Sequence, residues 1–317
     1  MCGIFPIAQK NYLIMEKVKR LTIAISAYNE GKNIKNFLMS VLSQKEEGFK
    51  LDNIWVYSDG STDNTERQVK SIKSPKIVLF SDKKRVGKSS RLNQIYKNLK
   101  SDILVQSDAD VIFSHPYVIR DLITPLLKDD KVGMTGGNPL PFQGVTWLEK
   151  AINYTCEAYN YFRYNVRGGN NVFSADGRLL AYRKELVTKI KVPLDMIAND
   201  AYTYYCCLTH NYKYKFAPQA VVNYRSPQNL KDHIKQNTRF LAAPIRMSKY
   251  FNPSLIKYET SIPTFIKIKS FLSVFIRHPL STFLIFIINK YCLILAKMNE
   301  AKMNAKWEMA MSTKITT

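Results

Sequence analysis

Two aspartates one residue apart, Asp108 and Asp110, have the spacing in this sequence that most directly suggests chemistry. They follow the apolar run ILVQS, and two carboxylates at the end of a strand can share a divalent cation and a ribose. Hard cations such as Mg²⁺ or Mn²⁺ prefer oxygen ligands, often one or two carboxylates together with substrate phosphates. A single D-x-D pair also occurs by chance in many loops, so the pair needs support from its surroundings.

A second polar cluster, SDGSTDNT, follows the apolar run IWVY. Asp59 stands at the end of that run, and Gly60 permits a close backbone approach. A carboxylate in this place can accept a hydrogen bond from a base imide or a ribose hydroxyl. The alternative is an ordinary turn and helix cap, because the next three residues are all good N-cap residues.

A third cluster, VGKSSRLN, contains the GKS tripeptide of phosphate-binding loops. The Walker A pattern requires glycine at the position that Asp82 holds, so we exclude that motif. Lys88 and Arg91 remain candidates for facing a diphosphate.

Strands alternate with helices around these clusters. Such alternation predicts βαβ units and a mostly parallel sheet, in which ligands bind beyond the carboxyl ends of the strands. The clusters YNE, SDG and DAD all stand at such ends. The expected strands are Leu21–Ala27, Ile54–Ser58, Ile77–Ser81, Ile103–Ser107 and Val132–Gly136, and the expected helices are Lys32–Ser43, Asp63–Ile72, Ser89–Leu99 and His115–Leu127.

The pattern changes after about residue 137. We expect helices at Trp147–Asn165 and Asn199–Leu208 and a strand at Ala220–Tyr224. The first of these helices carries a stripe of aromatic residues, which is either part of the core or a platform for an acceptor sugar.

The C-terminal region is apolar and basic. Ile268, Phe271, Leu272 and Phe275 line one face of an expected amphipathic helix, and Pro279 suits the first turn of another. The segment 280–296 is about long enough to span a bilayer. Its Lys290 opposes insertion by roughly 2.5–3.5 kcal/mol, so we favour an interfacial or re-entrant hairpin over a spanning helix. The alternative is a helical pair packed on the protein's own core.

Charge supports an anionic partner without identifying it. The chain has 47 Lys and Arg against 25 Asp and Glu, a formal net charge of +22. Residues 241–317 hold 11 Lys and Arg against 3 Asp and Glu, which suits an anionic membrane surface. The five cysteines form no C-x-x-C pair, so we interpret them as reduced thiols.

Taken in order, the motifs SAYNE, VYSDGSTDNT, GKSSRLNQ, ILVQSDADV, IANDAYTYYCCLTHNYKYKFAPQAVVNY and QNTRF resemble the inverting glycosyltransferases of family two. The best likeness is to membrane-associated synthases of the polysaccharide, chitin and hyaluronan type. The resemblance implies an α/β protein with the GT-A fold. It divides the chain into an N-terminal leader at 1–20, a GT-A domain at 21–240 and a C-terminal, membrane-associating helical region at 241–317.

On the donor side, the resemblance places Ala27, Tyr28 and Glu30 beside the nucleobase and ribose. Asp59 would contact the base, expected to be uracil, and Lys88 would lie near the diphosphate. The two aspartates of the D-x-D pair would then have different roles. Asp108 would contact ribose or sugar, and Asp110 would hold Mg²⁺ or Mn²⁺.

On the acceptor side, the resemblance makes Asp200 the general base. Gln236, Arg239 and Phe240 match the family's Q-x-x-R-W element beside the diphosphate and acceptor. Asp176 and Arg178 align with an acceptor loop. The expected partners are a nucleoside-diphosphate sugar, a glycan or lipid-linked acceptor and an anionic membrane surface on the cytoplasmic side, with no nucleic acid.

The chain departs from this family in four respects. The usual Glu-Asp pair reads Asn199-Asp200, Phe240 replaces tryptophan, and Asn211 replaces a glycine. Asparagine is the next-best residue for a left-handed turn, so we expect that turn to be kept. The several transmembrane helices of processive synthases are not seen, so we do not expect this chain alone to secrete a polymer.

Three other functions remain open on the sequence alone. A sugar-phosphate nucleotidyltransferase also uses a nucleotide-binding sheet and a carboxylate-held metal, but YNEGKN is a poor version of its glycine-rich loop. The net charge would suit a nucleic-acid-binding protein, although no RNP, KH or zinc-finger pattern is found. The departures at Asn199 and Phe240 would also fit a protein that binds a nucleotide sugar without transferring it.

Overall fold

The computed structural model describes residues 18–304, 306 and 310–314. Within them, eight strands form one mixed sheet in the order β3-β2-β1-β4-β7-β6-β8-β5. The first four are mutually parallel, β7 is antiparallel to both β4 and β6, and β6 runs parallel to β8. The strands are β1 (Lys19–Ala27), β2 (Phe49–Asp59), β3 (Ile77–Asp82), β4 (Ile103–Ser107), β5 (Val111–Phe113), β6 (Val132–Pro141), β7 (Leu179–Arg183) and β8 (Lys213–Tyr224).

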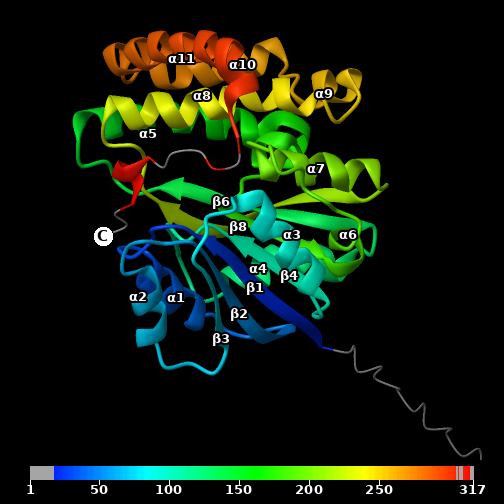
Figure 1. Ribbon diagram of the computed structural model, residues 1–317. Helices are drawn as coiled ribbons and strands as arrows, with labels where there is room; N and C mark the ends of the chain where they lie inside the picture. The colour runs from blue at the N-terminus through cyan, green and yellow to red at the C-terminus, as the bar shows by residue number, and fades with distance from the viewer. Residues whose placement is uncertain (1–17, 305, 307–309, 315–317) are drawn as a thin grey trace, which may run out of the picture.

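Helices cover both faces of this sheet, which confirms the expected α/β architecture (Figure 1). Alternate side chains of β1 face the helix layers on opposite sides of the sheet. Ile23 and Ile25 pack with α1 and α4, whereas Ala24 packs with α3 and α7. The helices are α1 (Ile34–Leu42), α2 (Thr65–Ser71), α3 (Lys88–Asn98), α4 (Val118–Lys128), α5 (Trp147–Asn165), α6 (Lys184–Val187), α7 (Asn199–Thr209), α8 (Leu230–Met247), α9 (Pro253–Glu259), α10 (Thr264–Phe275) and α11 (Pro279–Asn299).

The predicted elements are all present, but several are longer than expected. Strand β6 continues to Pro141, five residues beyond the expected end, through two prolines that cannot donate a ladder hydrogen bond. Strand β8 begins seven residues earlier than expected, at Lys213. Asn211 has φ 62°, so the asparagine does keep the left-handed turn before β8.

Strands β5 and β7 were not expected. The segment SADGRLLAY, residues 174–182, was expected to belong to an acceptor-side loop and not to contain a strand. In the structure LLAYR forms β7, which pairs with β4 on one side and β6 on the other. A buried five-residue strand has no alternation of polar and apolar side chains, so periodicity alone does not reveal it.

A layer of helices, α5, α8, α10 and α11, is stacked at one end of the sheet (Figure 1). Helix α11 packs against α8 and α5 through a narrow stripe that includes Ile285, Cys292 and Ala296. Asn289 of α11 accepts a hydrogen bond from Asn237 of α8 at 2.7 Å and lies 3.1 Å from Nε2 of His233. Polar and apolar contacts therefore both fix α11 on α8.

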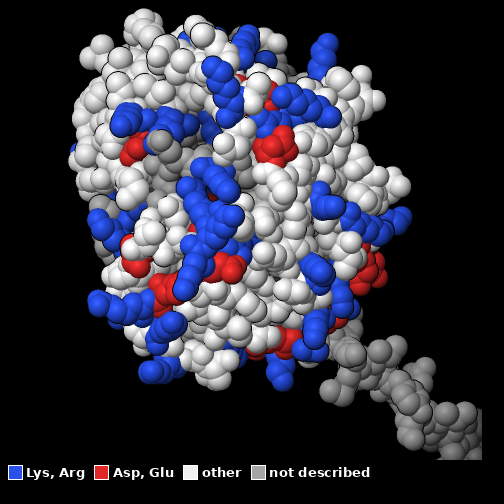
Figure 2. Space-filling view, viewed as in Figure 1, with Lys and Arg blue, Asp and Glu red and all other residues white. Residues whose placement is uncertain are grey.

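The apolar stripe identified in α10 is largely exposed, although Phe275 is half-buried and Phe271 also contacts Phe286 of α11. Ile268, Phe271 and Leu272 are exposed, whereas the buried residues of this helix include Ile266 and Val274. The outer face of α11 is likewise apolar. Uncharged atoms dominate the top edge of the molecule around these helices (Figure 2). The pair packs on the protein through one side only.

Both of the predicted boundaries within the chain can be compared with the structure. The proposed leader at 1–20 lies mostly outside the described residues, although Lys19 and Arg20 belong to β1. Helix α8 runs through residue 240, so the boundary proposed there lies inside a helix. The four cysteines among the described residues are free thiols.

Candidate active site

The polar clusters meet where β1, β2 and β4 end. These strands are neighbours and run parallel, so their carboxyl ends lie along one edge of the sheet. Glu30 follows β1, Asp59 is the last residue of β2, and Asp108 follows β4. The topology therefore brings together the residues that the sequence placed at strand ends.

The two aspartates of the D-x-D pair have different cationic partners. Asp108 forms an ion pair with Lys88, the first residue of α3. Asp110 lies 2.9 Å from the ammonium of Lys314, near the C-terminus. Burial by itself would raise the pKa of Asp110, but the charge and hydrogen bond of Lys314 outweigh it and lower that pKa. Asp110 is therefore held as an anion.

Asp59 faces its own chain. Its carboxylate accepts hydrogen bonds from the backbone N–H groups of Val86 and Gly87, both at 2.9 Å, and from Nε of Arg91 at 2.8 Å. The side chain of Asp59 is almost wholly buried. In this structure the carboxylate orders the loop before α3, and its expected contact with a nucleobase remains a prediction.

Arg91 does not lie where the sequence analysis placed it. Instead of facing an open diphosphate site, its guanidinium is 1% exposed and forms ion pairs with Asp59 and Asp82. Residues three apart lie on neighbouring positions of a helix surface, so it is the packing of α3 against β2 and β3 that buries Arg91 while Lys88 reaches Asp108.

Gly60 is required by the packing of this same loop. Its φ is +71°, and a Cβ there would lie 2.7 Å from the backbone nitrogen of Arg85. The close approach expected at Gly60 is thus made by the protein's own loop. The same loop carries Arg85, whose guanidinium lies 4.0 Å from the centre of the Tyr28 ring. Tyr28 is one of the residues expected to border the nucleobase.

Asp200 lies in the first turn of α7. Its carboxylate accepts hydrogen bonds from the N–H groups of Gly177 at 3.2 Å and Ala201 at 2.9 Å. Burial, followed by the negative charge of Asp176, raises the pKa of Asp200 above its ordinary value. A carboxylate with a raised pKa is a stronger base, which is the property that accepting a proton from a hydroxyl requires.

Asn199 connects this carboxylate to the donor edge. Its side-chain oxygen accepts a hydrogen bond from the buried Ser89 hydroxyl at 2.9 Å. Ser89 follows Lys88 in α3, and Asn199 precedes Asp200 in α7, so one hydrogen bond ties the two helix N-termini together. A neutral amide makes this contact, at the position where the family pattern has a glutamate.

The expected acceptor residues lie on the same side of the sheet as the aspartate pair. Arg178 forms an ion pair with Asp176 at 2.9 Å, and its guanidinium lies 3.8 Å from the centre of the Tyr224 ring. The Ser107 hydroxyl donates to the Arg178 carbonyl at 2.7 Å. That bond fixes the loop before β7 against the last residue of β4, directly before Asp108.

The three expected residues of the Q-x-x-R-W element lie on α8. Burial lowers the pKa of Arg239, while the negative charges of Asp200 and Asp108 oppose that shift. Arg239 therefore lies within the electrostatic reach of both aspartates. Its guanidinium is 5.3 Å from the centre of the Phe240 ring, which is 46% exposed, and Gln236 is half-buried.

Lys314 is a charged residue of the site that the sequence analysis missed. Its ammonium bridges Glu30 and Asp110, which lie 284 and 204 residues earlier in the chain. Burial raises the pKa of Glu30 to about 7, although Lys314 opposes the shift. No motif or periodicity marks Lys314, so the sequence offers no signal for this contact.

The carboxylates around Asp110 suit a metal that is shared with a substrate. Among the described residues, no group of three or more His, Cys, Asp or Glu side chains converges into a complete metal site. Magnesium-type sites commonly use one or two carboxylates and take their other ligands from water and phosphate. The Lys314 ammonium at Asp110 shows that this position accepts a cation.

The aromatic stripe of α5 is divided between packing partners. Tyr159 and Phe162 make edge contacts with Phe173, whereas Tyr154 stacks on His278 at 3.6 Å between ring centres. These rings are half-buried or partly exposed, and they contact both the loop before β7 and the C-terminal helices. The stripe is therefore largely packed against other parts of the protein.

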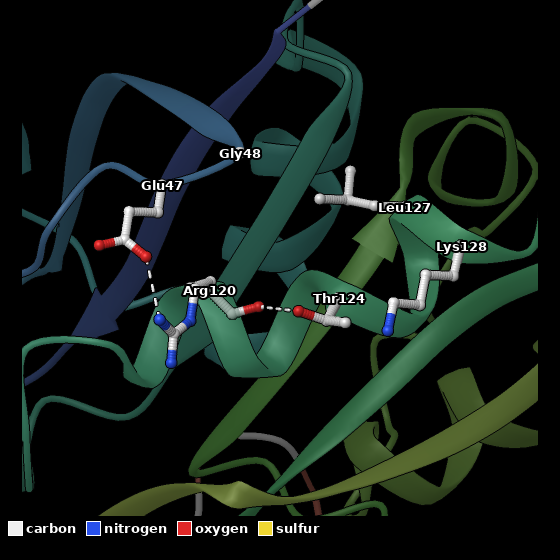
Figure 3. A pocket seen from close by; sticks show the side chains of 6 residues that line it. All are labelled: Glu47, Gly48, Arg120, Thr124, Leu127 and Lys128. Atoms are coloured by element: carbon white, nitrogen blue, oxygen red, sulfur yellow. Dashed lines mark hydrogen bonds and ion pairs between the residues drawn. The ribbon is translucent and has the colours of Figure 1, made fainter. Parts of the chain in front are cut away.

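Two hollows on the surface lie away from the carboxylate cluster. One of about 490 Å³ adjoins the start of β2, at the opposite end of that strand from Asp59, and Figure 3 shows the Glu47–Arg120 ion pair beside it. Its lining residues are Glu47, Gly48, Arg120, Thr124, Leu127 and Lys128. A second, of about 440 Å³, lies between the end of β6 and α5. Neither contains a residue expected to bind the donor.

The profile of glycosyl transferase family 2 matches residues 22–191, more than half of the chain. The chain belongs to glycosyltransferase family 2. The matched segment holds β1 to β7, and with them Asp59, Lys88, Asp108 and Asp110. This membership identifies the protein as a glycosyltransferase and therefore decides against the nucleotidyltransferase alternative.

Two curated relatives of this glycosyltransferase are bacterial synthases. The chain is 26% identical over 242 residues to poly-β-1,6-N-acetyl-D-glucosamine synthase of Staphylococcus aureus strain COL, covering 74% of this chain and 57% of that protein. It is 25% identical over 233 residues to the synthase of the same name from Staphylococcus epidermidis, covering 71% and 54%. The chain thus spans little more than half the length of these relatives.

A solved structure with the same fold is the mannosyltransferase PcManGT of Pyrobaculum calidifontis in complex with GDP-Man and Mn²⁺. The TM-score is 0.57 at 18% identity, over 90% of this chain and 75% of that one. The similarity confirms the expected GT-A fold.

Proposed function

We propose that this glycosyltransferase moves a sugar from a nucleoside-diphosphate sugar, with UDP as the nucleotide, to a hydroxyl of a saccharide or lipid-linked acceptor, with inversion. The observation that carries this proposal is Asp200. Its half-buried carboxylate accepts two backbone hydrogen bonds, has a raised pKa and lies within electrostatic reach of Lys88, the partner of Asp108.

The donor assignment rests on two observations. Glu30, Asp59 and Asp108 line the edge of the sheet where nucleotides bind in open α/β folds. The staphylococcal relatives are named for a polymer of N-acetylglucosamine, which makes UDP-N-acetylglucosamine the first donor to test. GDP-mannose is the second, because the structurally similar mannosyltransferase holds it.

Asp200 would accept the proton of the acceptor hydroxyl as that oxygen attacks the anomeric carbon. Lys88 and Arg239 would place positive charge beside the leaving diphosphate, where such charge stabilises the transition state. Asp110, with Asp108 beside it, would hold Mg²⁺ or Mn²⁺. A bound metal of this kind supplies further neutralisation of the leaving group.

The acceptor would approach from the side of Asp176 and Arg178. Their mutual ion pair and the Tyr224 ring hold both side chains in place near Asp200. The exposed face of Phe240 would form an aromatic wall for the acceptor sugar.

We also propose that α10 and α11 attach the enzyme to a membrane surface, with the catalytic domain on the cytoplasmic side. Helix α11 is long and apolar enough to cross a bilayer, and it is the one candidate among the described residues. Its contacts with α8 through Asn289 favour a helix lying in the interface over one that leaves the protein to span the membrane. Exposed Phe283 and Ile287 would enter the lipid.

The test is release of nucleoside diphosphate from a panel of nucleotide sugars, with and without Mn²⁺, by the wild type and Asp200→Asn. Removing a general base typically lowers the rate by about 10²–10⁴-fold. Asp130→Asn is the matched control, because Asp130 is 96% exposed and lies far from the sheet edge in question. Full activity in Asp200→Asn would overturn the assignment of the base.

A further inference from the structure

The ammonium of Lys314 binds the carboxylate of Asp110, which the proposed function assigns to a metal. Its nitrogen lies 2.9 Å from Oδ2 of Asp110 and also contacts Oε1 of Glu30. The Lys314 side chain is 15% exposed, so this is a largely enclosed ion cluster and not a surface pair. An ammonium enclosed in this way is stabilised only if anions compensate for its lost hydration.

The chain before Lys314 is anchored, so the contact is part of a defined structure. The backbone N–H of Ser312 donates to Oδ2 of Asp232 at 2.8 Å, and the Ser312 hydroxyl accepts from the N–H of Gln228 at 3.1 Å. Thr313 is buried. These bonds attach the segment 310–314 to the first turn of α8, the helix that carries Arg239.

The electrostatics explain why the cluster needs a cation. The Lys314 ammonium contacts one carboxylate oxygen of Asp110 and one of Glu30, and all three side chains are largely buried. In the absence of a metal, two neighbouring carboxylates would otherwise repel each other in a poorly solvated site. Lys314 is the positive charge that holds them together.

A divalent metal bound to Asp110 would lie within a few ångströms of this ammonium, which is 2.9 Å from Oδ2. Two cations at that separation repel strongly. Binding of a metal with the donor diphosphate must therefore displace Lys314 from Asp110 or be weakened by it.

We propose that Lys314 is a donor-site residue that acts as a built-in cation, holding Asp110 and Glu30 together until a divalent metal bound to a nucleoside diphosphate takes its place. This inference rests on the proposed function, because it takes Asp110 as the metal ligand. The ligands it concerns are Mg²⁺ or Mn²⁺ and the diphosphate.

The test measures Mn²⁺ binding to the full-length protein by titration calorimetry, with and without UDP. Lys314→Met removes the charge and keeps most of the length of the side chain. We expect this variant to bind Mn²⁺ more tightly than the wild type, on the order of tenfold. Lys302→Met, at an exposed lysine of the C-terminal region, serves as the control and should leave the affinity unchanged.

Two further variants keep the result interpretable. Asp232→Ala removes the anchor of Ser312 without touching the carboxylate cluster, so it should also tighten Mn²⁺ binding if Lys314 competes with the metal. Asp110→Asn should abolish Mn²⁺ binding. If Asp110→Asn binds Mn²⁺ like the wild type, the proposed metal ligand is wrong.

The inference about Lys314 fails separately from that assignment. If Asp110→Asn loses Mn²⁺ but Lys314→Met binds it with unchanged or weaker affinity, then Lys314 does not compete with the metal. Weaker affinity would show that Lys314 positions Asp110 for the metal instead.

Discussion

Two regions contribute charged residues to one site by different routes. The donor edge is where β1, β2 and β4 end, and the C-terminal layer is formed by α8, α10, α11 and the segment 310–314. At the donor edge, Glu30, Asp59 and Asp108 stand at or just after the ends of neighbouring parallel strands. In the C-terminal layer, Arg239 comes from the middle of a helix and Lys314 from a short anchored segment. The first arrangement follows from sheet topology, whereas the second depends on tertiary packing alone.

The buried pair of Arg91 and Asp59 offers the sharpest test of how rigid the donor edge is. We expect Arg91→Leu to lower the free energy of unfolding by about 3–5 kcal/mol, because it leaves the Asp59 carboxylate buried without its guanidinium. Urea denaturation followed by circular dichroism measures this loss.

Arg120→Leu is the control for Arg91→Leu. Arg120 pairs with Glu47 at 2.9 Å, but both side chains are well exposed, so its loss should cost less than about 1 kcal/mol. Equal losses in the two variants would show that Asp59 does not depend on its buried partner.

The C-terminal layer is tested by its attachment to lipid. We expect Phe283→Ser combined with Ile287→Ser to weaken binding to anionic vesicles, because each buried apolar side chain contributes about 1.5–3 kcal/mol. Flotation of the full-length protein with phosphatidylserine-containing vesicles measures this binding.

Met39→Ser is the matched control for that variant, since Met39 is an exposed apolar residue on α1 of the sheet domain. We expect it to float like the wild type. Wild-type protein that stays unbound at low salt, or a double variant that floats equally well, would contradict the proposed membrane face.

The smallest expected effect concerns the electrostatic coupling between Asp176 and Asp200, which lie between the two regions in the chain. The charge of Asp176 is, after burial, the main cause of the raised pKa of Asp200. Asp176→Asn removes that negative charge, so the pKa of Asp200 should fall. The acid limb of the pH profile of kcat/KM should then move to lower pH, because the base stays ionised in more acidic solution.

Measuring kcat/KM between pH 4 and 9 for the wild type and Asp176→Asn tests this prediction, with Asp130→Asn as the control for loss of a surface charge. An acid limb that stays in place or moves to higher pH would show that the charge of Asp176 does not raise the pKa of Asp200.

The sequence predicted the donor half of the fold well, for physical reasons. The strand at Ile103–Ser107 and the helix at Trp147–Asn165 have the expected bounds, because polar or turn-forming residues flank each apolar segment. The D-x-D pair lies at the expected edge because strand order places β1 and β4 side by side.

The remaining features depend on contacts that no local pattern encodes. Arg91 and Lys88 lie in one short cluster, yet only packing decides that Arg91 is buried against Asp59 while Lys88 reaches Asp108. Strand β7 has no periodicity of its own, and Lys314 joins its partners across most of the chain. The direction of the α10 stripe likewise depends on which face packs against α5.

Asn289 fixes the rotation of α11 about its own axis. Its side-chain oxygen contacts His233 and Asn237 of α8, and Asn237 lies within one turn of both Gln236 and Arg239. Turning α11 about its axis would break both contacts and leave polar groups of α8 without partners in a largely apolar layer. A surface bound to the exposed side of α11 would therefore lie at a fixed distance and angle from Arg239. If the proposed acceptor is anchored in that surface, the same two contacts would set how far it must reach to Arg239.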